Sequence, residues 1–289
     1  MPDFSITDTH VHLVDPAKIQ YSWLESEPAL NRPWHLDDYN RATESVEIGK
    51  IVFMEVCPDY HEIHNEVAWI TELAQADPRI QGIIANARFE EGDTIEGILE
   101  VHANSPLVRS IRRVTQDLDI DFCIQPEFIE GVRLLSKHDL LCDVCVYHPQ
   151  LPNIIKLVDA CPNVQFVLDH VGKPDIKNQV FEPWKADIKS LAERENITCK
   201  ISGMVTEADH SNWKPDDLAP YILHVIECFG FDRVIYGGDW FVMTLAAEYP
   251  QWIDLLDRTL DGCGETDLRK FYVDNADRVY GLGAGGMQG

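Results

Sequence analysis

The chain has 289 residues, with 24 lysines and arginines against 49 aspartates and glutamates and a formal net charge of −25. This length can bury a sizeable core, and 45% hydrophobic with 25% charged residues is ordinary for a soluble globular protein. So acidic a chain repels phosphate backbones and anionic lipids, which excludes nucleic acids and membrane surfaces as favoured partners.

The N-terminus and the cysteines indicate a cytoplasmic protein. The opening residues MPDFSITDTHVH lack the basic and apolar regions of a signal peptide, and no apolar run reaches the roughly 18–20 residues of a membrane span. The eight cysteines are scattered, mostly in apolar segments, as expected of reduced thiols. Cys142 and Cys145 form a CxxC motif, but residues three apart on a strand point to opposite faces and cannot chelate one ion together.

Short β-rich runs alternate with longer amphipathic stretches along the chain. In chain order, the predicted strands are Ser5–Leu13, Lys50–Val56, Ile80–Arg88, Val108–Val114, Cys142–Tyr147, Gln165–His170, Thr198–Gly203 and Arg233–Asp239. Several are nearly continuous in Val, Ile, Leu or Phe, which is typical of strands covered on both faces. Helical spacing of apolar residues is clearest in the intervening segments Glu62–Ala76, Glu127–His138, Pro183–Glu195 and Thr244–Leu260.

Eight strand–helix pairs predict an α/β fold, a (β/α)8 barrel, for which about 250 residues is typical. A doubly wound sheet is the alternative, but its GxGxxG motif is absent. No linker composition divides the chain, so residues 1–282 are predicted to form a single domain, followed by a disordered Gly-rich tail, residues 283–289. The long segment Asp15–Pro33, which contains Trp23, is expected to lie over the active-site face.

Ionisable side chains gather where the predicted strands end, and a barrel places its chemistry at those ends. The first strand ends in DTHVH, where alternation puts Asp8, His10 and His12 on one face. Two such imidazoles can share a divalent metal. The later strand ends carry Glu55, Arg112, Arg113, Tyr147, His148, Asp169, His170, Asp239 and Trp240. Each of these residues also has a purely structural explanation, but their joint placement at the strand ends predicts an active site.

These segments resemble the amidohydrolase superfamily, and within it the sugar-lactonase branch that includes L-fuconolactonases and L-rhamnonolactonases. The resemblance rests on HxH in the first strand, LDHVGKP in the sixth, KISG in the seventh and GGDW in the eighth, and it extends from Thr7 to Leu282. It implies an amidohydrolase-type barrel and a hydrolase of carbohydrate catabolism that opens a sugar-derived γ- or δ-lactone to the free acid.

Lactone hydrolysis needs a water nucleophile, a base, and positive charge beside the developing oxyanion. The resemblance places the base at Asp239, for which the alternative is an aspartate that caps the following helix. His170 is expected to face the carbonyl or the leaving oxygen as ligand, electrophile or acid. Arg112 can pair with a carboxylate or polarise the carbonyl, whereas Arg113 should face the other way.

The resemblance also implies one divalent metal, with zinc as the favoured ion, held by His10, His12 and Asp239. His148 is the additional ligand expected, and a surface loop histidine is its alternative. A two-metal site is disfavoured because the fourth strand offers Arg112 where binuclear relatives place a bridging lysine or glutamate. Metal-independent hydrolysis also occurs in this part of the superfamily, so metal occupancy stays open.

The candidates for contact with the substrate are Glu55, Arg112, Tyr147, Trp23 and Trp240. Glu55 is alternatively a metal ligand or a buried, hydrogen-bonded carboxylate, and the aromatic residues alternatively pack the rim. Two other functions are compatible with the sequence: a metal-dependent decarboxylase of a small carboxylic acid on the same fold, and a sugar-binding barrel without turnover. The sugar, the lactone ring size and the oligomeric state stay open.

Overall fold

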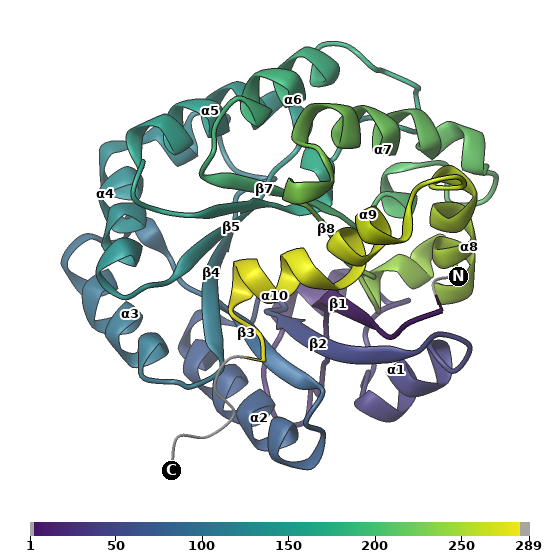
Figure 1. Cartoon of the computed structure of the whole chain (residues 1–289). Coiled ribbons are helices and arrows are strands. Elements are labelled where there is room, and N and C mark those ends of the chain that lie inside the picture. Colours follow the sequence, from purple (N-terminus) through teal and green to yellow (C-terminus); the bar gives the residue numbers. More distant parts are fainter. Residues whose placement is uncertain (1–2, 284–289) are drawn as a thin grey trace.

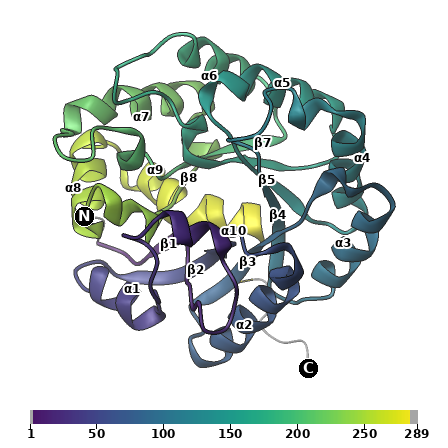
Figure 2. The same ribbon diagram turned by 180° about the vertical axis from the view of Figure 1, so that it is seen from behind.

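The computed structural model describes residues 3–283, and its eight strands form one parallel sheet in the order β1 to β8. The strands are β1 (Ile6–Val11), β2 (Ile48–Met54), β3 (Ile80–Asn86), β4 (Val108–Val114), β5 (Leu141–Cys145), β6 (Phe166–Leu168), β7 (Ile197–Ile201) and β8 (Val234–Tyr236). They curve into a nearly closed barrel surrounded by helices (Figures 1 and 2). The predicted (β/α)8 fold is confirmed, and residues 284–289 of the predicted tail lie outside the described residues.

A helix follows each strand. These helices are α1 (Leu36–Ala42), α2 (Ile63–Ala76), α3 (Ile95–Ala103), α4 (Pro126–Leu134), α5 (Leu151–Ala160), α6 (Trp184–Ala192), α7 (Pro215–Phe229) and α8 (Tyr249–Thr259), and the short α9 (Glu265–Arg269) and α10 (Asn275–Tyr280) come last. A proline in the first turn begins α4, α5, α7 and α8, where its missing N–H has no helical partner to lose. Among the described residues, no helix is long and apolar enough to cross a membrane.

Helix α10 covers one end of the barrel (Figure 1). A cluster of buried side chains joins the strand interior to this C-terminal segment: Val52, Met54, Ile84, Val167, Ile235, Ala276, Tyr280 and Leu282. Lys50, near the start of β2, pairs with Asp277 of α10 at 2.6 Å. The covered end is therefore the one at which the strands begin, and the end at which they finish is left for the functional site.

The barrel closes between β8 and β1 through the residues that follow β8. The Asp239 N–H donates to the carbonyl of His10 at 2.9 Å, and the His12 N–H donates to the carbonyl of Trp240 at 2.7 Å. Just before them, the Gly238 N–H donates to Asp8 Oδ1 at 2.8 Å. A Cβ on Gly238 would lie 2.5 Å from the Asp8 carboxylate, so this approach requires glycine. The closing seam therefore places His10 of β1, and His12 just after β1, beside Asp239.

The long segment after β1 lies over the C-terminal ends of the strands, as predicted. The Trp23 indole N–H donates to the carbonyl of Val56, just beyond β2, at 2.8 Å. The Tyr21 hydroxyl donates to Glu66 on α2 at 3.1 Å. All eight cysteines are free, and Cys142 and Cys145 are both buried.

His102 of α3 is a buried histidine that supports the end of β3. Its Nε2–H donates to the carbonyl of Asn86, the last residue of β3, at 3.1 Å, and its ring lies 4.8 Å from that of His64. Burial lowers the pKa of His102 from 6.5 to about 4, and the neighbouring His64 contributes to the shift. The folded chain therefore keeps this ring neutral at a pH where the unfolded chain protonates it.

This difference predicts a measurable pH dependence of stability. Because the pKa of His102 is lower in the folded chain, its contribution to the free energy of unfolding is complete above pH 6.5 and is lost as the pH falls towards 4. By pH 5.5 the loss is about 1.5 kcal/mol. Urea unfolding at pH 8 and pH 5.5 measures this loss. Between these two pH values, His102→Gln should lose about 1.5 kcal/mol less of its free energy of unfolding than the unchanged chain. An identical pH dependence in both would contradict the assignment.

Candidate active site

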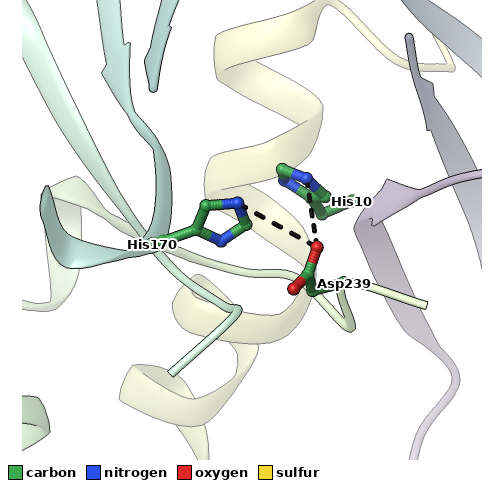
Figure 3. Close-up of side chains that lie close together, drawn as sticks. All are labelled: His10, His170 and Asp239. Carbon is green, nitrogen blue, oxygen red and sulfur yellow. Dashed lines mark ion pairs between the residues drawn. The ribbon is translucent and has the colours of Figure 1, made fainter. Parts of the chain in front are cut away.

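Three imidazoles converge on one carboxylate oxygen at the C-terminal end of the barrel. Asp239 Oδ1 lies 3.5 Å from His10 Nε2, 3.6 Å from His12 Nε2 and 4.0 Å from His170 Nε2. Figure 3 shows His10 and His170 directed at this oxygen. All four side chains are buried. The structure thus brings together four of the residues that the sequence singled out, from β1, from the turn after β6 and from the seam after β8.

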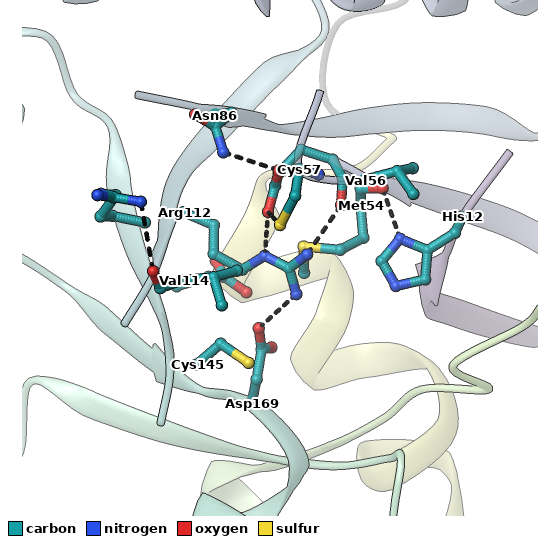
Figure 4. Close-up of polar contacts among 12 residues, drawn as sticks. His12, Met54, Val56, Cys57, Asn86, Arg112, Val114, Cys145 and Asp169 are labelled. Atoms are coloured by element: carbon teal, nitrogen blue, oxygen red, sulfur yellow. Dashed lines mark hydrogen bonds and ion pairs between the residues drawn. The ribbon is translucent and has the colours of Figure 1, made fainter. Parts of the chain in front are cut away.

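The ring of His12 has a defined orientation. Its Nδ1 lies 2.9 Å from the carbonyl of Met54, which only accepts hydrogen bonds, so Nδ1 carries the proton (Figure 4). In the neutral ring, the Nε2 lone pair then faces the Asp239 carboxylate at 3.6 Å. Two electron-rich atoms at this separation are stabilised by a cation or a proton donor between them.

The donor set fits a divalent cation. Among residues 3–283, neither ring nitrogen of the fully buried His10 has a hydrogen-bond partner, and such orphaned polar atoms are unusual in a protein interior. The ligand atoms of His10, His170 and Asp239 lie within 4.8 Å of one another, and His12 adjoins Asp239. Imidazole and carboxylate groups in this number are the ligands of zinc and similar ions.

The protonation states of these side chains are those that metal binding requires. Burial lowers the pKa of His10 well below its ordinary value and that of His170 to about 4. Both rings are therefore neutral at physiological pH and keep a lone pair. Burial alone would raise the pKa of Asp239, but the neighbouring His170, His12 and His10 hold it below its usual range, so this carboxylate is ionised.

Asp169 stands behind His10. Its Oδ1 lies 3.6 Å from His10 Nδ1 and 2.9 Å from Lys200 Nζ, and its Oδ2 accepts from Arg112 Nη1 at 3.3 Å. Lys200 is fully buried and also pairs with Asp143 at 2.8 Å. The sequence interpretation missed Lys200, although a lysine within the apolar run of β7 is a visible signal. A carboxylate behind a ligand histidine fixes its ring orientation.

Arg112 is bound within the protein (Figure 4). Its Nε donates to Glu55 Oε1 at 2.6 Å and its Nη2 donates to the Glu55 carbonyl at 2.8 Å, in addition to the bond to Asp169. The Glu55 carboxylate also accepts from the Cys57 N–H and from Asn86 Nδ2, at 2.7 and 2.9 Å. The structure thus gives Glu55 the alternative role of a buried, hydrogen-bonded carboxylate, and Arg112 positions Glu55 and Asp169.

Two residues named from the sequence lie apart from the cluster. His148 comes after β5, where its N–H donates to the Lys173 carbonyl at 3.3 Å, and its charged neighbours are Asp175 and Asp187. Among the described residues, His148 is not one of the side chains whose ligand atoms lie together with Asp239. Trp240 is 1% exposed and packs edge-on against Trp34 and Tyr39, which fits the alternative of an aromatic packing residue. Tyr147 and Trp23 are half-buried at the rim.

His170 is held by an unusual turn and by β7. His170, Val171 and Lys173 have φ of 53°, 50° and 44°, the left-handed region that costs about 1–2 kcal/mol for a residue with a side chain. His170 Nδ1 lies 2.9 Å from Ser202 Oγ. A Cβ on the next residue, Gly203, would lie 2.2 Å from the same Nδ1. The LDHVGKP and KISG segments therefore form one unit that positions the ring.

This packing generates a stability prediction. Gly203→Ala places a methyl group against His170 at a φ of 57°, whereas Gly281, which lies in the left-handed region with a φ of 60°, has open space where its Cβ would lie. Both substitutions should lower the free energy of unfolding by about 1–2 kcal/mol through backbone strain, and Gly203→Ala by about 1–3 kcal/mol more through overpacking. Urea unfolding measures both. Equal losses of unfolding free energy in the two variants would show that the His170 ring moves aside at no cost in stability.

The chain matches the amidohydrolase family over residues 7–282. An L-fucono-1,5-lactonase of Burkholderia ambifaria is 34% identical, with 94% of each chain covered, and one of Burkholderia multivorans is 27% identical, with 95% of each covered. An amidohydrolase from Burkholderia multivorans, solved with bound zinc, has a TM-score of 0.85 at 25% identity and covers 96% of this chain and 100% of its own. The resemblance read from the strand ends is confirmed: the chain belongs to the amidohydrolase family.

Proposed function

We propose that this protein is a lactonase that hydrolyses a sugar-derived lactone to the free acid. The observation that carries the proposal is the convergence of His10, His12 and His170 on one oxygen of Asp239. The similarity to two L-fucono-1,5-lactonases supports a 1,5-lactone of a sugar acid as the substrate and favours hydrolysis over decarboxylation. This chemistry uses the ionised carboxylate as a base in a water-poor site.

In the proposed mechanism, Asp239 takes a proton from a water molecule whose oxygen attacks the lactone carbonyl carbon. In the tautomer that carries its proton on Nε2, His170, oriented by Ser202, donates to the carbonyl oxygen as it becomes an oxyanion; in the other tautomer its Nε2 lone pair is available to a cation. The ring C–O bond then breaks, and the proton held by Asp239 passes to the departing ring oxygen. The products are a carboxylic acid and a free hydroxyl group, so the water is fully accounted for.

His10, His170 and Asp239, with His12 beside them, are the residues that would hold a divalent cation. When bound, such an ion acts as a Lewis acid that lowers the pKa of water and polarises a carbonyl. The zinc in the similar Burkholderia multivorans amidohydrolase supports zinc as the ion. Asp169 orients the His10 ring from behind, and the Arg112 and Lys200 cations keep Asp169 ionised, because they outweigh burial and hold its pKa below its usual range.

The base assignment predicts the behaviour of Asp239→Asn. This amide keeps the shape of the side chain but cannot accept the proton, so kcat should fall by about 100-fold or more, with an unchanged circular dichroism spectrum. A panel of γ- and δ-lactones, including L-fucono-1,5-lactone, followed with a pH indicator, measures acid release. Wild-type rates in Asp239→Asn would remove this residue from the mechanism.

The metal assignment predicts a contrast between two histidines. Purified protein should hold about one divalent ion per chain, and His10→Asn should lose it, because His10 lies in the cluster. His148→Asn should keep it, because His148 lies apart. Elemental analysis and calorimetric titration of chelator-treated protein with zinc measure both variants. Loss of the ion in His148→Asn alone would restore the expectation drawn from the sequence.

A further inference from the structure

A second charged pair lies at the same end of the barrel as the histidine cluster. Lys173 ends the left-handed turn after β6, and Glu207 ends the short 3₁₀ helix Val205–Glu207 that follows β7. Lys173 Nζ lies 3.5 Å from Glu207 Oε1, and the two side chains are 14% and 17% exposed. The pair is therefore mostly buried yet keeps contact with the open end of the barrel.

This pair adjoins the reaction centre. Burial disfavours the Lys173 ammonium, but Cys145, Glu207 and Asp239 outweigh burial and raise the pKa of Lys173. Lys173 in turn acts with burial to lower the pKa of His170. The Lys173 N–H also donates to the carbonyl of His170 at 2.8 Å, so the turn that holds His170 also carries this ammonium. The ammonium has three N–H groups and serves as a hydrogen-bond donor and not as a base.

The pair is loose compared with the other buried ion pairs of the barrel. Lys200 lies 2.8 Å from Asp143 and 2.9 Å from Asp169, whereas Lys173 and Glu207 are 3.5 Å apart. A charge-assisted N–H···O bond is about 2.7–2.9 Å long. Burial raises the pKa of Glu207, although Lys173 opposes the shift. Among the described residues, neither the carboxylate nor the ammonium has a charged partner closer than this 3.5 Å pair.

An alcohol satisfies both groups at once, because a hydroxyl donates one hydrogen bond and accepts others. It can donate to Glu207 while it accepts from Lys173. The ring of Tyr147, whose centroid lies 5.3 Å from Lys173 Nζ, adds an aromatic surface beside the pair. A donor, an acceptor and an aromatic face together suit a hydroxylated ring with an apolar C–H face.

We propose that Lys173 and Glu207 form the subsite that recognises a ring hydroxyl of the lactone and so select hydroxylated lactones over unsubstituted ones. The inference rests on the proposed function and extends it to substrate choice. A site whose buried polar groups are completed by a substrate hydroxyl discriminates strongly against an analogue that lacks it, because those groups are then left unpaired. The hydroxyl takes no part in the bonds that form and break, so its contact is made equally in the ground state and the transition state and should act chiefly on KM.

The experiment compares L-fucono-1,5-lactone with δ-valerolactone, which has the same ring size and no hydroxyl groups. Lys173→Met should raise KM for the hydroxylated lactone by about 10- to 100-fold with kcat within about 3-fold. It should leave KM for δ-valerolactone within about 3-fold, and any effect on kcat of removing the charge near Asp239 and His170 should be the same for both lactones. Lys173→Arg, which keeps the charge, should recover part of the loss, and Glu207→Gln should raise KM less than Lys173→Met does.

Lys177→Met is the matched control, because Lys177 is an exposed lysine four residues further along the chain, and it should leave both substrates unchanged. Thermal unfolding establishes that each variant is folded. The subsite would be overturned if Lys173→Met raised KM equally for both lactones, or lowered kcat at unchanged KM. Wild-type constants in Lys173→Met would also overturn it. Wild-type protein that opens neither lactone would overturn the proposed function itself, and this result is distinct from the others.

Discussion

The Asp8 carboxylate is the contact on which the barrel and its site both depend. Its two oxygens accept from the N–H groups of Gly238 and His10, at 2.8 and 3.0 Å, and from the hydroxyls of Tyr39 and Tyr249, at 3.0 and 2.7 Å. It thereby joins the first strand to the segment after the last strand and to α1 and α8. Because His10 and Asp239 directly neighbour these contacts, the closure of the barrel also sets the separation of the reacting groups. Loss of the carboxylate would leave several buried donors unpaired, at about 1–3 kcal/mol each.

Next to the histidines, the interior of the barrel contains charged side chains, whereas many barrels are filled by apolar ones. A chain of contacts runs from the hydroxyl of Tyr280 in α10 through Asp143, Lys200 and Asp169 to His10. Buried ion pairs contribute little net stability, because desolvation offsets the Coulomb attraction. Their value here is positional: the charges fix Asp169, and Asp169 fixes the His10 ring. The helix that covers the far end of the barrel is thus linked physically to the reaction centre.

The sequence predicted the strands and the inward side chains of β1, because apolar runs and alternation follow directly from strand geometry. It also predicted that His10, His12, His148, His170 and Asp239 gather at one end of the barrel, because parallel strands end at one face. The individual roles, with His148 among the ligands, came from the resemblance to the family. The turns beyond the strand ends were not predictable in this way. The left-handed turn after β6 carries Lys173 to the Glu207 side chain, and the turn after β5 leaves His148 outside the described group of ligand atoms around Asp239. Neither conformation follows a period of two.

The remaining disagreements have equally specific causes. Trp240 looked like a rim aromatic because it follows Asp239, yet it is buried against Trp34 and against Tyr39 of α1. Arg112 looked free to bind a substrate carboxylate, because no sequence pattern shows that Glu55 and Asp169 already occupy it. Arg113, in contrast, faces outward as alternation predicts and pairs with Glu90 at 2.7 Å.

The seam also has a consequence for how the protein is made. Asp8 and Gly238 are 230 residues apart in the chain. At about 5–20 residues per second, a ribosome needs about 10–50 seconds to synthesise the interval between them. Throughout that time the growing sheet has two unpaired edges, and Asp8 lacks both the Gly238 N–H and the Tyr249 hydroxyl. A newly made chain is thus most exposed to aggregation before its eighth strand emerges, and the histidine cluster forms only at the end of synthesis.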